Sequence, residues 1–319
     1  MFKRLWKPEA VHHVLRSLIL AGFAVYVAHL AGSNKLSLYI APRMTDYVKW
    51  SAIALYAVAA YQAYLALSAL WDKRHSHACE CEHPPSGSLW KHTAAYGLFL
   101  LPLVLGFLTP DTALGSSLAD KKGMNLSSSA SLKDGSKPSN LPPAASNAKK
   151  DPADPAQQNG LQAGPVPSSE DLNSLFPADE YTEAYAKYGK QIYKQPLIIV
   201  EEQSFIETLT TLDLFRKPFI GKEVEISGFV YRSEGMNKQQ FVISRFIMNC
   251  CSADASPYGL LVQFDHANRY PDDTWIKIRG TLDQTVFNEN EILVLQAKQI
   301  QKITPPESPY VYPNYDFGS

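Results

Sequence analysis

A short tract of alternating residues holds the densest group of metal-binding side chains in this sequence. Its imidazoles and thiols are spaced H-x-H-x-C-x-C-x-H and belong to His75, His77, Cys79, Cys81 and His83. Thiolate and imidazole are the ligands that suit zinc and other borderline-soft transition metals. Because the spacing differs from that of a closed zinc knuckle, the tract predicts transient metal loading on a loop. The alternative is a solvated loop that happens to be rich in histidine.

Two adjacent cysteines near the end of a predicted strand form a second thiol pair. Cys250 and Cys251 are followed closely by Asp254. Neighbouring strand residues point to opposite faces, so one interpretation places one of the cysteines in the core. A strained vicinal disulfide is the second interpretation. The third is a soft-metal site completed by Asp254 or His266, although turn chemistry is the ordinary role of Asp265 and His266 after a strand.

Several classes of protein are excluded or disfavoured. Ser252 lies beside the thiols, but no set of nucleophile, base and orienting group accompanies it, so no enzymatic activity is predicted. The chain has 30 Lys and Arg against 31 Asp and Glu, which gives no electrostatic basis for binding nucleic acid. Four cysteines among 319 residues are too few for a disulfide scaffold.

Three hydrophobic segments predict transmembrane helices, because a bilayer core requires about 20 apolar residues in a helix. They comprise residues 14–32, 47–71 and 89–108. Pro102 and Gly106 interrupt the third segment, for which an interfacial or re-entrant path is the alternative. The connector between the first two segments, 33–46, is predicted to be short and amphipathic.

The distribution of lysine and arginine predicts the orientation of these segments. Basic residues are grouped before the first segment and between the second and third, which places both regions inside. The protein is therefore predicted to be a multi-pass protein of the cell membrane with an extracytoplasmic C-terminal domain. If the third segment does not cross, that domain is cytoplasmic. In the first orientation the His/Cys tract is cytoplasmic and its thiols stay reduced.

A linker rich in Ser, Pro and Ala separates two predicted domains. Residues 116–170 contain no Phe, Trp, Tyr or Ile, so they cannot bury enough apolar area to fold. We expect a transmembrane domain over 1–110, a disordered linker over 111–176 and a soluble domain over 177–319. A flexible coil of about 55 residues would span roughly 40 Å, allowing the distal domain to move away from the membrane.

The distal domain is predicted to be a small all-β, OB-like barrel with one or two helices. Short segments of alternating polarity separated by glycine-containing breaks are typical of such a barrel, and a small sandwich is the alternative. Gly228 and Gly280 lie inside strand patterns, where bulges or corners use glycine. A helix over 177–191 is predicted to pack a tyrosine face on this domain through Tyr181, Tyr185 and Tyr188. The other predicted elements are a helix over 204–215 and strands over 197–200, 222–232, 240–250, 258–265, 274–282 and 292–299.

Three sequence stretches, together with the basic N-terminus, the early spans and the His/Cys tract, carry a family resemblance. They read GKEVEISGFVYR, FVISRFIMNCCSADASPYGLLV and WIKIRGTL. With them the chain resembles the YcgQ-like DUF1980 family of bacterial permease subunits. The resemblance implies a larger multi-spanning permease as partner and a role in transport, with metal ions as candidate cargo. It also implies that Cys250, Cys251 and Asp254 are motif positions and that Trp275 and Gly280 are structural.

The favoured function is that of an accessory subunit of a bacterial membrane permease complex. It would handle zinc or another transition metal through its Cys and His residues. Three spans without an inverted repeat are too few for a self-contained transporter, so a partner permease follows. The alternative is an envelope scaffold or sensor whose β-domain binds a protein or ligand, with Cys250 and Cys251 redox-active or structural.

Overall fold

The computed structural model describes residues 8–71, 89–126, 169–233 and 235–318. By its internal contacts the chain divides into two compact units. The first comprises Met1–Ala113 together with Asn249–Asp254, and the second comprises Leu114–Met248 together with Ala255–Ser319. The short stretch Asn249–Asp254 lies in sequence between two strands of the second unit, yet it packs with the first.

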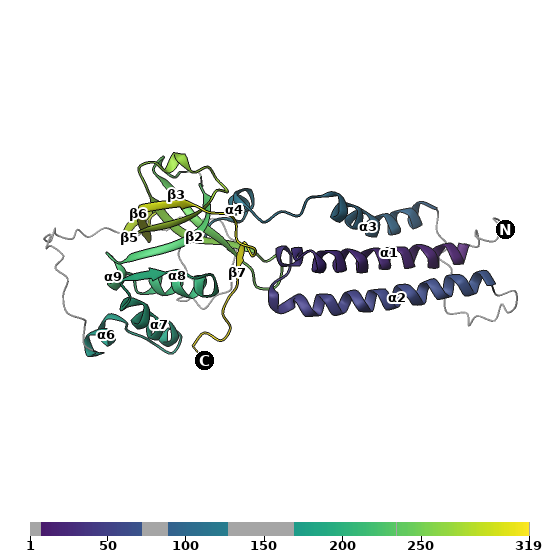
Figure 1. Ribbon diagram of the computed structural model, residues 1–319, viewed down its shortest axis with the longest axis horizontal. Coiled ribbons are helices and arrows are strands. Elements are labelled where there is room, and N and C mark those ends of the chain that lie inside the picture. The colour runs from purple at the N-terminus through teal and green to yellow at the C-terminus, as the bar shows by residue number, and fades with distance from the viewer. Residues whose placement is uncertain (1–7, 72–88, 127–168, 234, 319) are drawn as a thin grey trace. The chain divides into compact units, whose positions relative to one another are not determined.

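Three long helices dominate the first unit: α1 (Pro8–Gly32), α2 (Thr45–Trp71) and α3 (Leu89–Leu108) (Figure 1). Among the described residues, two helical stretches are long and apolar enough to cross a membrane, Val11–Gly32 and Pro42–Ser68. The three predicted hydrophobic segments are therefore all helical. The crossing of α3, which contains Pro102, stays a prediction.

Close packing joins α1 to both other helices (Figure 1). Where α1 meets α3, Gly22 packs against the side chain of Leu103, and Gly106 packs against the ring of Tyr26. Tyr26 also meets Phe107 edge to face, with 5.0 Å between ring centroids. Small residues at such crossings are typical of membrane helices, because they let two backbones approach closely.

Hydrogen bonds made by polar side chains add to this packing. His12 Nδ1 lies 2.9 Å from the Tyr96 hydroxyl, which links α1 to α3. His13 Nδ1 lies 2.7 Å from Gln62 Oε1, which links α1 to α2. The Ser17 hydroxyl donates to the Ala59 carbonyl of α2 at 2.9 Å. Polar groups that would be costly in hydrocarbon are thus satisfied between helices.

The connector between α1 and α2 is an ordered element. It forms two 3-10 helices, η2 (Lys35–Leu38) and η3 (Pro42–Met44), and buries Leu36 and Ala41. Between them, Tyr39 lies in a turn, Ile40 forms a β-bridge and Ala41 is extended. This arrangement gives the connector a defined conformation beyond the ends of the helices.

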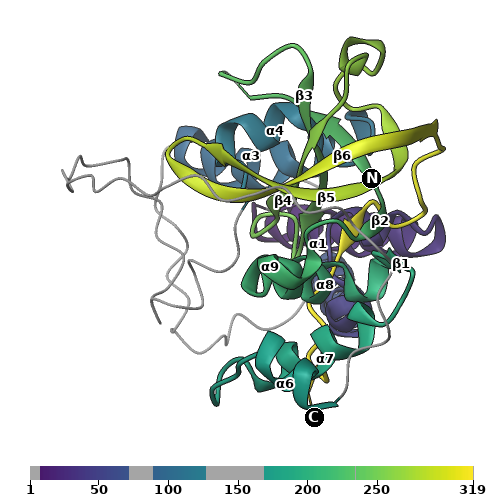
Figure 2. The same ribbon diagram turned by 90° about the vertical axis from the view of Figure 1, so that its left-hand side faces the viewer.

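A mixed seven-stranded sheet forms the centre of the second unit (Figure 2). Its order is β1-β2-β5-β6-β4-β3-β7, with three parallel pairs, β1–β2, β4–β6 and β3–β7, and otherwise antiparallel pairs. The strands are β1 (Leu197–Ile199), β2 (Glu223–Tyr231), β3 (Gln240–Ile247), β4 (Ser256–Gln263), β5 (Trp275–Phe287), β6 (Asn290–Lys302) and β7 (Tyr310–Val311).

An additional pairing between β2 and β3 joins five strands, β2, β5, β6, β4 and β3, in a closed cycle of hydrogen-bonded neighbours. The OB-like barrel itself stays a prediction. Gly280 lies at a register shift in the β5–β6 pair, which confirms the predicted bulge. At Gly228 a Cβ would strike the backbone carbonyl of Ser244, so glycine permits the close approach of β2 and β3.

The strand boundaries differ from the predictions in three places. β3 ends at Ile247, before the cysteines, and β5 and β6 each extend to 13 residues. Their hairpin turns through Asn288 and Glu289, whose positive φ values of 49° and 67° suit the backbone twist of a tight hairpin. No glycine marks this turn, so the sequence did not reveal it. The two-residue β7 is also too short to carry a periodic pattern.

Helices cover the core of the second unit. The predicted apolar face of α8 (Phe205–Leu214) is confirmed, because Phe205, Leu209, Leu212 and Phe215 are all buried. These side chains pack with the sheet in one continuous hydrophobic cluster. The remaining helices are α4 (Ser116–Lys122), α6 (Ser169–Leu175), α7 (Glu183–Tyr193), η4 (Glu202–Ser204), α9 (Arg216–Phe219) and η5 (Ala267–Arg269).

The expected tyrosine face is only partly correct. Tyr185 and Tyr188 pack against the ring of Phe317, at 4.9 and 5.6 Å between centroids. Tyr181 is 79% exposed, so its predicted docking is wrong. The Asp179 carboxylate accepts the backbone N–H groups of Tyr181 and Thr182, which holds this segment in a turn before α7 begins.

The predicted linker over 111–176 also contains folded parts. α4 belongs to the second unit, with Ala119 fully buried and Ser116 hydrogen-bonded to Asp273 through its backbone and hydroxyl. α6 belongs to the same unit. Residues 127–168 lie outside the described residues, but both of their flanks belong to the second unit. Their predicted disorder stays a prediction, while α4 and α6 show that both flanks of the predicted linker contain helices.

A buried carboxyl group in the second unit has a hydrogen-bond partner for only one of its two oxygens. Glu207 is 3% exposed, and its Oε1 accepts the N–H of Asn314 at 2.8 Å, whereas its Oε2 has no partner among the described residues. Burial raises the pKa of Glu207, and the Asn314 N–H only partly opposes that shift. The native state therefore binds this proton more tightly than the unfolded chain does.

We expect Glu207→Gln to flatten the pH dependence of stability. Below the unfolded pKa of about 4.3 both states are protonated, and as pH rises through the raised native pKa the wild type loses stability. The amide cannot ionise and keeps an acceptor for Asn314. Thermal unfolding followed by circular dichroism between pH 4 and 9 measures this, with the exposed Glu307→Gln as control. Equal pH slopes in both variants would contradict the expectation.

Candidate functional site

The adjacent cysteines lie in the loop Asn249–Asp254 and pair with the α1–α2 connector. Cys251 forms an antiparallel β-bridge with Ile40. The Ala41 N–H donates to the Cys250 carbonyl at 3.0 Å, and the Ser252 N–H donates to the Tyr39 carbonyl at 2.8 Å. These backbone bonds explain why the loop belongs to the helical unit.

The thiols and a carboxylate converge within this loop. Both cysteines are free and half-buried, and their sulfur atoms lie 3.7 Å apart. One ligand atom each from Cys250, Cys251 and Asp254 lies within 4.8 Å of the others. Two thiolates bound to one tetrahedral zinc at about 2.3 Å each would have sulfurs about 3.8 Å apart. The observed sulfur separation therefore fits one edge of a zinc tetrahedron.

Hydrogen bonds from the backbone hold Asp254 in place. Its Oδ1 accepts the N–H of Asn249 at 3.0 Å, and its Oδ2 accepts those of Cys250 at 2.7 Å and Cys251 at 3.4 Å. Burial raises the pKa of Asp254, but hydrogen bonds from the Cys250 thiol and these N–H groups outweigh it, so the pKa is lowered. Asp254 is thus an ionised carboxylate that shapes the loop.

The same carboxylate keeps the Cys250 thiol protonated. A hydrogen bond to Asp254, followed by one to Cys251 and by burial, raises the pKa of Cys250 to about 11. A metal ion must therefore displace a proton to bind this sulfur, which makes affinity depend on pH. Three protein ligands leave a fourth tetrahedral position for water or an exchanging ligand. Such a site suits capture and release of an ion.

The other predicted ligands are His266 and the His/Cys tract. His266 precedes η5 in the second unit, where its ring meets Phe264 edge to face, and it is not part of the thiol group. The tract His75, His77, Cys79, Cys81 and His83 lies outside the described residues, so its metal binding stays a prediction. Within the described ranges, Cys250, Cys251 and Asp254 are the one group of at least three such residues able to hold an ion.

Sequence reasoning missed the partner of the cysteine loop. Residues 39–41 contact it through backbone groups, which leave no signature in residue type. The apolar sequence LYIA was the only signal, and it was interpreted as part of an amphipathic connector. Two chain segments about 200 residues apart thus build the site together.

The fold and the site define a class of protein: a unit with helices of membrane-spanning length and a thiol loop, combined with a β-sheet unit. Two family models match the chain, the DUF1980 N-terminal domain at residues 15–125 and the DUF1980 C-terminal domain at 175–313. The chain belongs to the DUF1980 family. This confirms the family resemblance in the sequence.

Two relatives match the chain over nearly its full length. A Bacillus subtilis protein named "UPF0703 protein YcgQ" is 27% identical over 310 residues, which cover 94% of this chain and 99% of the relative. A Streptococcus mutans protein named "Putative two-component membrane permease complex subunit" is 25% identical over 311 residues, with the same coverage.

Proposed function

We propose that this protein is a subunit of a two-component membrane permease complex and captures a soft or borderline divalent cation such as Zn²⁺. The observation that carries the metal part is the 3.7 Å separation of the Cys250 and Cys251 sulfurs beside the Asp254 carboxylate. The printed name of the Streptococcus relative supports the permease part. The proposal assigns no enzymatic activity to the chain.

The position of the thiol groups along α2 supports a role in moving the ion. Cys251 is bridged to Ile40, shortly before α2 begins, while the His/Cys tract follows α2 directly in sequence. A helix of 27 residues is about 40 Å long, more than the roughly 30 Å of a bilayer core. If α2 and α3 both cross, the two thiol groups face opposite compartments and the second unit is extracytoplasmic. One protein would then meet the ion on both sides of the membrane.

An exposed stripe on α2 supports a membrane-embedded partner, the larger multi-spanning permease subunit. Its residues are three or four positions apart, so they lie on one face of the helix, and all are exposed. Two alanines at its centre allow close approach of another helix, and flanking aromatic residues offer packing area and hydroxyl groups that are costly to leave in hydrocarbon. The stripe consists of Tyr47, Trp50, Ala54, Ala57, Tyr61 and Tyr64.

The second candidate function is an envelope scaffold or sensor. The raised pKa of Cys250 favours it, because a protonated thiol at neutral pH is a poor metal ligand and suits a structural or redox role. In that case the closed cycle of five strands, which we propose is an OB-like barrel, would bind a protein or ligand.

Purification of the full-length tagged protein from membranes, with mass spectrometry for bound proteins and bound metal, separates these functions. The proposed function predicts a multi-spanning permease and zinc with the wild type. Cys250→Ser/Cys251→Ser should lower the metal content and retain the partner, while Ser252→Ala should retain both. If the wild type carries a partner but no metal, the scaffold function is favoured. If it carries no partner and no metal, the proposal is contradicted.

A further inference from the structure

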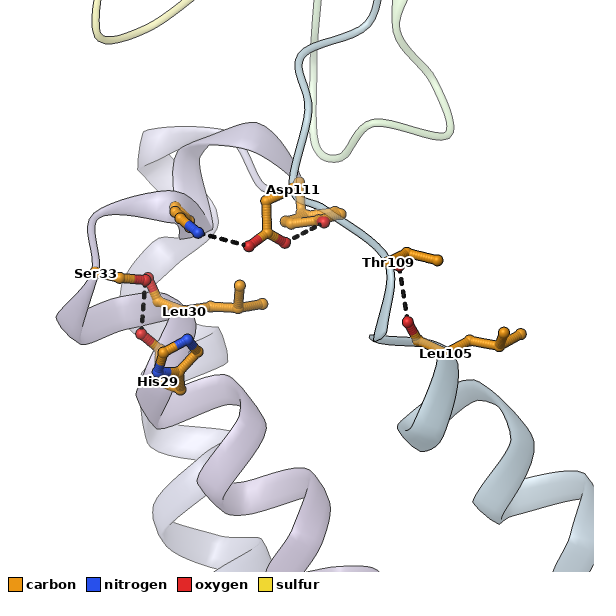
Figure 3. Close-up of polar contacts among 8 residues, drawn as sticks. His29, Leu30, Ser33, Leu105, Thr109 and Asp111 are labelled. Carbon is orange, nitrogen blue, oxygen red and sulfur yellow. Dashed lines mark hydrogen bonds and ion pairs between the residues drawn. The ribbon is translucent and has the colours of Figure 1, made fainter. Parts of the chain in front are cut away.

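The carboxylate that follows α3 holds the connector on which the cysteine loop is docked. Asp111 Oδ1 accepts the Tyr39 hydroxyl at 2.6 Å, and Oδ2 accepts Lys35 Nζ at 3.0 Å (Figure 3). The Asp111 side chain is 12% exposed, so water screens these contacts only partly. Bonds from Tyr39 and then Lys35 lower the pKa of Asp111, which keeps it ionised.

Tyr39 connects this carboxylate to the thiol loop. Its side chain donates to Asp111, while its backbone carbonyl accepts the N–H of Ser252 at 2.8 Å. The next two residues of the connector pair with Cys251 and Cys250. A single residue therefore lies between the carboxylate after α3 and the segment that carries both sulfurs.

A second contact holds the start of the cysteine loop. Arg43 Nε donates to the Asn249 carbonyl at 3.0 Å. Asn249 also donates its N–H to Asp254, so Arg43 acts on the residue at which the loop begins. Residues 39–43 thus hold the loop at both its start and its middle.

We infer that Tyr39 and Asp111 are positioning residues of the thiol site. They hold residues 39–41 in the conformation that pairs with Cys250–Ser252 and so maintain the spacing of the sulfurs. This inference rests on the proposed function for its consequence, which is tighter binding of the cation. Groups that orient metal ligands from outside the coordination sphere commonly contribute about 10–100-fold in metal affinity.

Two neighbouring hydrogen bonds serve as matched controls. The Ser33 hydroxyl donates to the His29 carbonyl at 2.8 Å, and the Thr109 hydroxyl donates to the Leu105 carbonyl at 2.7 Å (Figure 3). Both bonds stay within the last turn of their own helix. Their loss perturbs the same helix ends without reaching the segment that pairs with the cysteines.

The test uses the full-length protein in detergent with two readouts. Zn²⁺ titration measures affinity, and alkylation resolved by peptide mass spectrometry measures the exposure of Cys250 and Cys251. We expect Tyr39→Phe and Asp111→Asn to weaken Zn²⁺ binding about tenfold. Alkylation of both cysteines should be severalfold faster, because the undocked loop exposes them. Ser33→Ala and Thr109→Ala should match the wild type, and all variants should keep the helix content seen by circular dichroism.

The alkylation rate decides the inference. If Tyr39→Phe and Asp111→Asn are alkylated no faster than Ser33→Ala, the positioning role is overturned, whatever the Zn²⁺ titration shows. If the wild type takes up no Zn²⁺ but these two variants are alkylated faster, the positioning role stands and the proposed metal capture fails.

Discussion

Replacing Arg245 by alanine will destabilise the second unit by about 2–5 kcal/mol, because truncating this buried side chain leaves a cavity and leaves two carbonyls without their donor. The Arg245 guanidinium is fully buried. It donates to Glu202 at 2.8 Å, to the Ser308 carbonyl at 2.9 Å and to the Pro309 carbonyl at 3.3 Å. It also lies 5.2 Å from the Trp275 ring centroid.

The effect is large because Arg245 connects three separate segments. Arg245 lies on β3. Its bond to Glu202 links β3 to η4, and its bonds to the two carbonyls link β3 to the chain that leads into β7. Alanine would leave those carbonyls without their donor and open a cavity beside Trp275. The resemblance to the family implied a structural role for Trp275, and this contact is consistent with that role.

Unfolding of the full-length protein in detergent, followed by near-ultraviolet circular dichroism, measures the effect. The control is Arg279→Ala, because Arg279 forms an ion pair with Glu223 at 2.6 Å but its side chain is 44% exposed. Exposed pairs typically contribute about 0–1 kcal/mol. Similar denaturation midpoints for the two variants would show that Arg245 does not stabilise the unit as described.

The second large expected effect is faster modification of Cys250 in Asp254→Asn, by about tenfold at pH 8. The Asp254 carboxylate is the main reason that the pKa of Cys250 is raised from 9.0 to about 11. Removing this largest cause lowers the pKa of Cys250 toward its ordinary value, and a full return would increase the thiolate fraction at pH 8 roughly a hundredfold. The less basic thiolate is about tenfold less nucleophilic, which leaves the net gain of about tenfold.

The pH profile gives this prediction a second readout. In the wild type the alkylation rate of Cys250 should rise until about pH 11, whereas in Asp254→Asn it should level off at a lower pH. Asp46→Asn is the control, since Asp46 lies in the same unit with a side chain that is 85% exposed. If Asp254→Asn and Asp46→Asn have the same profile, Asp254 does not control the thiol.

Local patterns predicted much of the fold. The hydrophobic segments of the first unit became α1, α2 and α3, and the apolar spacing from Phe205 to Phe215 became the buried face of α8. Gly280 marked a real bulge. In each case the signal lies within one element, where the period of burial determines the residue pattern.

Features that depend on distant segments could not be predicted in the same way. α4 is polar and short, and contacts such as that of Ser116 with Asp273 stabilise it from far along the chain. Nothing in the sequence distinguishes Arg245 from an exposed polar residue of a strand, although it is completely buried in the structure. Tertiary contacts override local propensity at both places.

The same distinction explains the candidate site. Cys250, Cys251 and Asp254 are close in sequence, so their types and spacing were enough to predict the group. His266 was added because of its residue type, and the structure places it in the other unit. The docking of the loop on residues 39–41 involves backbone groups from two segments that are distant in sequence, which no pattern of side chains reports.

Titration of Zn²⁺ into the full-length protein, compared with Cys250→Ser/Cys251→Ser, tests most directly whether the paired thiols capture a cation. The complete chain is required because residues 39–41 are part of the docked loop. We expect the double variant to lose one equivalent of bound Zn²⁺ and the proton release that accompanies it, while any binding by the His/Cys tract persists. Identical titrations for the two proteins would contradict the metal site.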